Sequence, residues 1–274
     1  MQHAHAREPA VAGMFYPGTA AALERELARY VVLAEVEHDL IGCVAPHAGY
    51  MYSGAVAGKL YGHLRLPGRV IVLGPNHTGL GRPISVAPQD GWWTPLGEEP
   101  VDRELADLFL ERFPGAELDA DAHWREHSVE VQIPFLQARR ADIRVLPICL
   151  QHLPLETCLD LGRALADVIQ ALGEPVGLVA SSDMSHYEPD AEARNHDRKA
   201  IDAALTLDPE ALYGTVHSLG ITMCGVIPAT VVLEAARHLG ANAGHLVDYA
   251  TSGDVTGDRT SVVGYAGMCF YREA

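Results

Sequence analysis

The chain has 274 residues, of which 48% are hydrophobic and 20% charged, and this composition excludes an intrinsically disordered protein. Its 36 acidic and 20 basic residues give a net charge of -16, which disfavours nucleic acids and acidic membranes as partners. No run is apolar enough to span a membrane, and residues 1–7 lack a signal-peptide pattern, so we expect a cytoplasmic protein.

Apolar runs rich in β-branched residues alternate with helical patterns along the chain, which is typical of a mainly parallel sheet covered on both faces by helices. We expect strands at residues 40–45, 69–73, 84–87, 143–150, 176–180, 245–249 and 261–270. We expect helices at residues 20–33, 53–64, 102–113, 155–172, 190–206 and 225–239.

Ser53 and Asp102 are expected N-caps, because a side-chain oxygen at that position can accept a free backbone N–H. The 11 acids between Glu98 and Glu130 are expected on a solvated helical face. No repeat or long linker divides the chain. The pattern therefore predicts one α/β domain over residues 1–274, with a central, mostly parallel sheet flanked by helices on both faces.

Histidine is unusually common in this sequence, with 14 residues, and three of them follow predicted strands. His47 follows the first strand, His77 the second, and His186 the fifth, in the segment Ser181-Ser182-Asp183-Met184-Ser185-His186. Any one of them alone would be expected to hydrogen-bond a loop carbonyl. Because open α/β sheets bind ligands at the carboxyl ends of their strands, we expect at least two of the three to share one site.

Nine further histidines have no comparable setting and are expected to be structural or surface residues: His3, His5, His38, His63, His152, His196, His217, His238 and His245.

Cys224 differs from the other four cysteines, because it immediately precedes an apolar helix. The helix N-terminus favours a thiolate, the form of cysteine that binds metals. Cys43, Cys149, Cys158 and Cys269 lie inside apolar strands or a helix, where cysteine usually acts as a small hydrophobe. Two imidazoles and one thiolate would make a credible mononuclear site for iron, copper or zinc.

A competing metal motif is His123-Trp124-Arg125-Glu126-His127, which matches the HxxEH pattern of zinc metallopeptidases. That pattern needs a helix running through His123, whereas the clearer helical start lies at Glu126 and Pro134 interrupts its continuation. We therefore expect His127 to support the same strand-end site as a substrate contact or outer donor. No GxSxG, Walker A or GxGxxG motif occurs, so no nucleotide cofactor is expected.

Ordered motifs along almost the whole chain resemble the Memo family, which includes the prokaryotic proteins called AmmeMemoRadiSam system protein B. They are REPAVAGMFYP at 7–17, APHAGYMYSG at 45–54, GPNH at 74–77, TPLGE at 94–98, EHSVEVQIPFLQ at 126–137, SSDMSHY at 181–187, MCG at 223–225, TSGDVTGD at 251–258 and VVGYAG at 262–267.

The resemblance implies a fold like that of class III extradiol dioxygenases, a single α/β domain with a central mixed sheet. It implies one iron or copper ion held by His47, His77 and Cys224, since these residues match the family's ligands. His186 would be the catalytic acid/base, held by Asp183, and Tyr52 and His127 would line the cleft. A thiolate ligand departs from the carboxylate of extradiol enzymes, which places simple ring cleavage in doubt.

The function expected from this resemblance is a mononuclear metal-dependent oxidoreductase acting on a small molecule or peptide. Its expected partners are AMMECR-type and radical-SAM proteins. The alternative is a non-catalytic adaptor that binds a phosphopeptide or small ligand in the same cleft, and a less favoured one is the HxxEH metallopeptidase. A net charge of -16 suits phosphopeptide binding poorly unless the cleft is locally basic.

Overall fold

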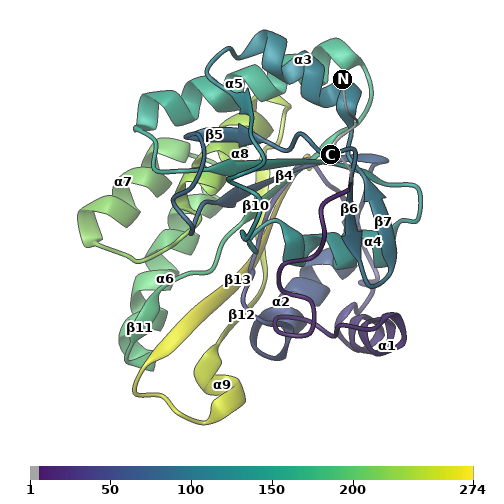
Figure 1. Ribbon diagram of the computed structural model, residues 1–274. Helices are drawn as coiled ribbons and strands as arrows, with labels where there is room; N and C mark the ends of the chain where they lie inside the picture. The colour runs from purple at the N-terminus through teal and green to yellow at the C-terminus, as the bar shows by residue number, and fades with distance from the viewer. Residues whose placement is uncertain (1–5, 274) are drawn as a thin grey trace.

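The computed structural model describes residues 6–273 and contains a nine-stranded mixed sheet between two layers of helices (Figure 1). The α-helices are α1 (Ala20–Tyr30), α2 (Tyr50–Gly62), α3 (Arg103–Arg112), α4 (Ile133–Arg139), α5 (Leu155–Leu172), α6 (Asp190–Leu205), α7 (Pro209–Leu219), α8 (Val226–His238) and α9 (Ser252–Thr256). A 3-10 turn, η1 (Glu130–Gln132), precedes α4.

The strands are β1 (His38–Asp39), β2 (Gly42–Ala45), β3 (Leu64–Arg65), β4 (Arg69–Pro75), β5 (Ile84–Val86), β6 (Gly91–Thr94), β7 (Gly97–Pro100), β8 (Glu117–Leu118), β9 (Arg144–Leu150), β10 (Gly177–Ser181), β11 (His186–Glu188), β12 (Ala243–Thr251) and β13 (Val262–Tyr271).

Four adjacent parallel strands form the centre of the large sheet, in the order β2-β10-β4-β9. β13 joins β2 antiparallel and carries β11 and β12, while β5 joins β9 antiparallel and carries β8. The α/β fold with a central mixed sheet is therefore confirmed, and each of the seven predicted strands exists. Two small two-stranded sheets, β1-β3 and β6-β7, were not predicted.

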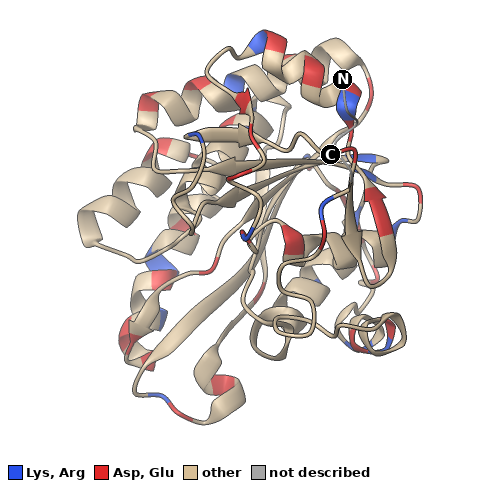
Figure 2. Cartoon of the chain, in the orientation of Figure 1, with Lys and Arg blue, Asp and Glu red and all other residues tan. Residues whose placement is uncertain are grey.

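The central strands are apolar on both sides because each side faces helices. In β4, Ile71 and Leu73 pack in the core under α3, α5 and α8, whereas Val70 and Val72 pack in the core under α1, α2 and α4. Such alternation between two cores explains why the sequence shows continuous apolar runs rather than alternating ones. Charged residues lie mainly on helices, loops and outer strands (Figure 2). The four central strands carry charge only at the first residues of β4 and β9, Arg69 and Arg144.

Of the two predicted helix caps, one differs from the structure and the other is confirmed. Helix α2 begins at Tyr50, so Ser53 is not its cap; the Ser53 hydroxyl instead donates to the Ala48 carbonyl at 3.0 Å. The glycine at position 49, which can cap without a side chain, allows this earlier start. Asp102 is the cap of α3 as predicted, since its carboxylate accepts from Leu105 N.

The acidic stretch from Glu98 to Glu130 is also not one solvated helical face. Only α3 is helical between residues 98 and 129, and Glu99, Asp102, Glu126 and Glu130 are buried. Buried carboxylates persist when other groups hydrogen-bond them, as Arg69 does for Asp102 at 2.6 Å. Among residues 6–273, no helix combines the length and apolar character that a membrane span requires.

Candidate metal centre

Three neighbouring parallel strands, β2, β10 and β4, end at one edge of the sheet, and the residues that follow them lie there. His47 follows β2, Asp183 follows β10 and His77 follows β4. The register pairs Ser181 of β10 with Ala45 of β2, so these chain ends leave the sheet at the same level. The strand-end placement that the sequence predicts thus brings residues more than 100 positions apart into one site.

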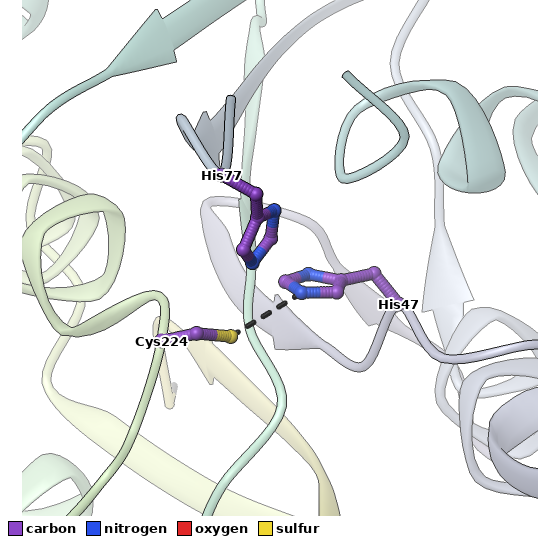
Figure 3. A group of neighbouring side chains, drawn as sticks. All are labelled: His47, His77 and Cys224. Atoms are coloured by element: carbon purple, nitrogen blue, oxygen red, sulfur yellow. Dashed lines mark hydrogen bonds between the residues drawn. The ribbon is translucent and has the colours of Figure 1, made fainter. Parts of the chain in front are cut away.

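His47, His77 and Cys224 point toward one another at this edge (Figure 3). One ligand atom from each lies within 4.8 Å of the other two. The Cys224 sulfur is 3.2 Å from His47 Nε2, and the His47 and His77 rings meet edge to face with centroids 5.2 Å apart. His47 is buried, while His77 is exposed on one side, so a small molecule can approach the group from solvent.

Hydrogen bonds fix the tautomer of both histidines. The Ser181 hydroxyl donates its single proton to the Ser128 carbonyl at 2.6 Å. His47 Nδ1 lies 3.0 Å from the Ser181 hydroxyl oxygen, so Nδ1 must be the donor in that hydrogen bond. His77 Nδ1 donates to the Glu126 carboxylate at 2.8 Å. In the neutral form of each ring, Nε2 therefore keeps its lone pair. Nε2 is then the ring atom that can coordinate a metal.

The charge states of the group follow from burial. Burial lowers the pKa of His47 well below its usual range, and the nearby rings of His127, His77 and His186 lower it further. Burial also raises the pKa of the Cys224 thiol, and the charge of Asp183 adds to this. In the metal-free protein, burial thus opposes the thiolate that the helix N-terminus was expected to favour at the start of α8.

This donor set fits a transition metal. Two imidazole nitrogens and one cysteine sulfur are ligands that iron, copper and zinc all accept. Three protein ligands also leave coordination positions free, as in catalytic sites. Each of the three residues can reach a common centre with its lone pair, because the ligand atoms already lie within 4.8 Å of one another.

Asp183 and His186 lie beside this group with partners other than those expected. Asp183 Oδ1 accepts from the backbone N–H groups of His47 at 2.8 Å and Ala48 at 3.3 Å, so it holds the His47 loop. Burial raises the pKa of Asp183 to about 6. The His186 ring donates from Nδ1 to the Thr222 carbonyl at 2.9 Å, and its backbone N–H donates to the Thr222 hydroxyl. Thr222, and not Asp183, therefore orients His186.

Of the two residues expected to line the cleft, only His127 has contacts with the candidate ligands in the described part of the chain. The His127 ring stacks on His77 with centroids 4.6 Å apart and contacts the Phe15 ring on another side at 4.7 Å. Burial lowers the pKa of His127. Tyr52 lies half-buried in the first turn of α2, and among the described residues it hydrogen-bonds to none of the three ligands.

The HxxEH segment does not form a peptidase motif. Residues 123–127 are turns rather than helix, and His123 is buried with its Nε2 beside the Ser85 carbonyl at 3.1 Å. Within the described part of the chain, His123 belongs to no group of potential metal ligands. The metallopeptidase alternative is therefore wrong in geometry, because Glu126 turns toward His77 instead of sharing a helix with His123.

Sequence reasoning missed the residues that hold the ligands in place. Ser181, Ser128, Gln132 and Thr222 all contribute hydrogen bonds to this network, and only the position of Ser181 at a strand end hinted at it. Of the nine histidines expected to be incidental, those within residues 6–273 join no group of potential ligands. His3 and His5 lie outside the described residues.

Comparisons with known proteins agree along nearly the whole chain. A family model described as Memo-like protein matches residues 7–269. A MEMO1 family protein of Methanosarcina mazei is 45% identical over 266 residues, covering 96% of this chain and 98% of the relative. A MEMO1 family protein of Aquifex aeolicus is 46% identical over 268 residues, with the same coverage of 96% and 98%.

Among solved structures, the uncharacterized protein JW3007 from Escherichia coli K12 has a similar α/β fold. Its TM-score is 0.58 at 16% sequence identity, and the match covers 84% of this chain and 99% of that chain. This likeness supports the fold alone. The sequence matches go further: the chain belongs to the Memo-like protein family.

Proposed function

We propose that this protein binds one iron or copper ion through His47, His77 and Cys224 and is a metal-dependent, dioxygenase-like oxidoreductase. The observation that carries the proposal is the convergence of these three side chains, with both Nε2 lone pairs aimed at the space beside the Cys224 sulfur. The bound ion would supply one-electron redox chemistry and Lewis acidity.

The residues around the group suit distinct tasks in such an enzyme. His186 can take up or release a proton at Nε2, because the Thr222 carbonyl occupies its Nδ1–H. Asp183 keeps the His47 loop in place through two backbone N–H groups. His127 and Tyr52 would contact a small-molecule or peptide substrate. AMMECR-type and radical-SAM proteins stay the predicted partners.

No observation favours the phosphopeptide adaptor. In the described part of the chain, no arginine or lysine hydrogen-bonds or ion-pairs with the side chains of His47, His77, His127, His186 or Cys224. Phosphate recognition commonly depends on arginine, which binds the phosphate oxygens in pairs. The surroundings of the group are built from imidazoles, carboxylates and aromatic rings instead.

The first test is metal content and affinity in anaerobically purified protein. Wild type should bind about one iron or copper ion per chain, and His47→Ala and Cys224→Ser should each weaken binding at least about tenfold because a ligand is lost. His217→Ala is the control, since that ring is exposed and, among the described residues, its hydrogen bond goes to the Tyr213 carbonyl in its own helix. Unchanged stoichiometry and affinity in both ligand variants would show that the site is elsewhere.

A second measurement separates the enzyme from the adaptor. Oxygen consumption that depends on the bound metal, and that is lost in Cys224→Ser, supports the oxidoreductase. A protein that binds no metal but binds a phosphotyrosine peptide tightly would overturn it in favour of the adaptor.

A further inference from the structure

Glu126 is a buried carboxylate that faces the outer side of the metal-ligand group, with only 1% of its side chain exposed. Its Oε2 accepts from the backbone N–H of His77 at 2.6 Å. Its Oε1 accepts from His77 Nδ1 at 2.8 Å and from the backbone N–H groups of His127 at 3.0 Å and Ser128 at 2.9 Å. One side chain thus contacts both the backbone and the ring of a single ligand.

We propose that Glu126 is the positioning residue of the metal centre: it holds His77 so that Nε2 points toward His47 and Cys224. This inference rests on the proposed function, because it assigns a role at the same site. A histidine ligand is normally oriented by the acceptor of its other ring nitrogen. Glu126 provides that acceptor and also anchors the backbone from which the ring projects.

The two histidine ligands differ in how much they depend on such an anchor. The His47 ring is fully enclosed and needs only the neutral Ser181 hydroxyl to fix its tautomer. The His77 side chain is 34% exposed and follows the last residue of β4, so packing alone restrains it less. A charged acceptor with four N–H donors around it is therefore the main restraint on this ring.

Glu126 does not serve as a ligand of its own in this arrangement. His77, Glu126 and His127 also form a group whose ligand atoms lie within 4.8 Å of one another. Using it as a second metal site would require His77 Nδ1 to lose the proton that it donates to Glu126. It would also take carboxylate lone pairs that already accept four N–H groups. The carboxylate thus already accepts four N–H groups, three at Oε1 and one at Oε2, and acts through His77.

The test uses Co²⁺ as a probe, because a cysteine-bound Co²⁺ ion has a sulfur-to-cobalt charge-transfer absorption band. The intensity of this band reports affinity, and its position reports coordination. Glu126→Gln replaces one acceptor oxygen by an NH₂ group that opposes an N–H donor. We expect it to bind Co²⁺ about 10- to 100-fold more weakly than wild type, with an altered absorption spectrum. Glu234→Gln is the matched control, because Glu234 is equally buried but pairs with Arg163 and Arg237.

A double-mutant cycle distinguishes positioning from a general structural role. In a His77→Ala background, Glu126→Gln should cause no further loss of Co²⁺ affinity, because its target ring is gone. Glu126→Asp keeps the charge, so this variant should bind Co²⁺ more tightly than Glu126→Gln. If Glu126→Gln does not fold, Glu126→Asp replaces it in the cycle.

Wild-type affinity in Glu126→Gln, or an equal loss with and without His77, would overturn the positioning role while leaving the metal centre intact. Failure of the wild-type protein to bind Co²⁺, Fe²⁺ or Cu⁺ would instead overturn the proposed function itself.

Discussion

Glu99 illustrates how burial changes the chemistry of one side chain. It lies in β7, is only 4% exposed, and its Oε1 has no hydrogen-bond partner among the described residues. Burial raises its pKa from 4.5 to about 8, and a hydrogen bond with Gln137 lowers it in part. The folded protein therefore prefers the protonated carboxyl, and the unfolded chain prefers the ionised one across this range.

This preference predicts a pH-dependent stability that one substitution removes. The contribution of Glu99 is fully present below about pH 4.5 and is lost as the pH rises through about 8. Glu99→Gln stays neutral, so at pH 9 we expect it to exceed wild type in free energy of unfolding by on the order of 1–3 kcal/mol. Urea unfolding at pH 5, 7 and 9 measures this, and the same pH slope in both proteins would contradict it.

Packing of helix against helix depends on small residues at close contacts. α5 and α8 pack against each other, and at Gly162 of α5 an added Cβ would lie 2.8 Å from the Val231 carbonyl oxygen and 2.7 Å from the Glu234 Cβ. Gly214 in the middle of α7 has nothing within 4 Å of the same position. The two glycines therefore differ in what an alanine would do.

We predict opposite effects of the same substitution at these positions. Gly162→Ala should lower the free energy of unfolding by about 1–3 kcal/mol, because the helices must move apart. Gly214→Ala should raise it by about 0.5–1 kcal/mol, because alanine favours a helix interior. Chemical denaturation of the two variants checks both. A stabilising effect of Gly162→Ala would contradict the close contact between α5 and α8.

Helix α7, which the sequence prediction missed, has a recognisable start and end. α7 begins at Pro209 after Asp208, whose carboxylate accepts from Glu210 N and Ala211 N, and ends at Gly220 with a φ of 64°. These are ordinary helix start and stop signals that the prediction did not use. By contrast, β6 and β7 form a separate hairpin whose short strands carry little apolar pattern.

In the molecule as a whole, one buried ion pair ties the N-terminal segment to the centre. Arg7 donates to the Glu130 carboxylate at 2.6 Å and to the carbonyls of His123 and Glu126, and its guanidinium lies 4.2 Å from the Trp92 ring centroid. Glu130 also accepts from the Tyr16 hydroxyl. The segment around residue 7 thereby braces the loop that carries Glu126.

Removing the cation should be costly. Arg7→Ala leaves the Glu130 carboxylate buried without its counter-charge, so we expect a loss of about 3–5 kcal/mol in the free energy of unfolding. The double variant Arg7→Ala with Glu130→Gln should recover part of that loss, since the buried charge is gone. Urea denaturation measures all three proteins. A loss below about 1 kcal/mol in Arg7→Ala would mean that water reaches Glu130.

Local patterns in the chain were sufficient for much of the fold and for the candidate metal ligands. Buried parallel strands produce apolar runs, and parallel strands end at one edge, so His47 and His77 could be picked out in advance. Cys224 was picked out by its place before an apolar helix, and the resemblance to the Memo family joined the three into one ligand set. The roles of Glu126, Ser181 and Arg7 depend on contacts between residues about 50 to more than 100 positions apart. The raised pKa of the Cys224 thiol depends on burial. Neither the long-range contacts nor the loss of solvation can be predicted from residues that are neighbours in the sequence. Only the tertiary structure determines them.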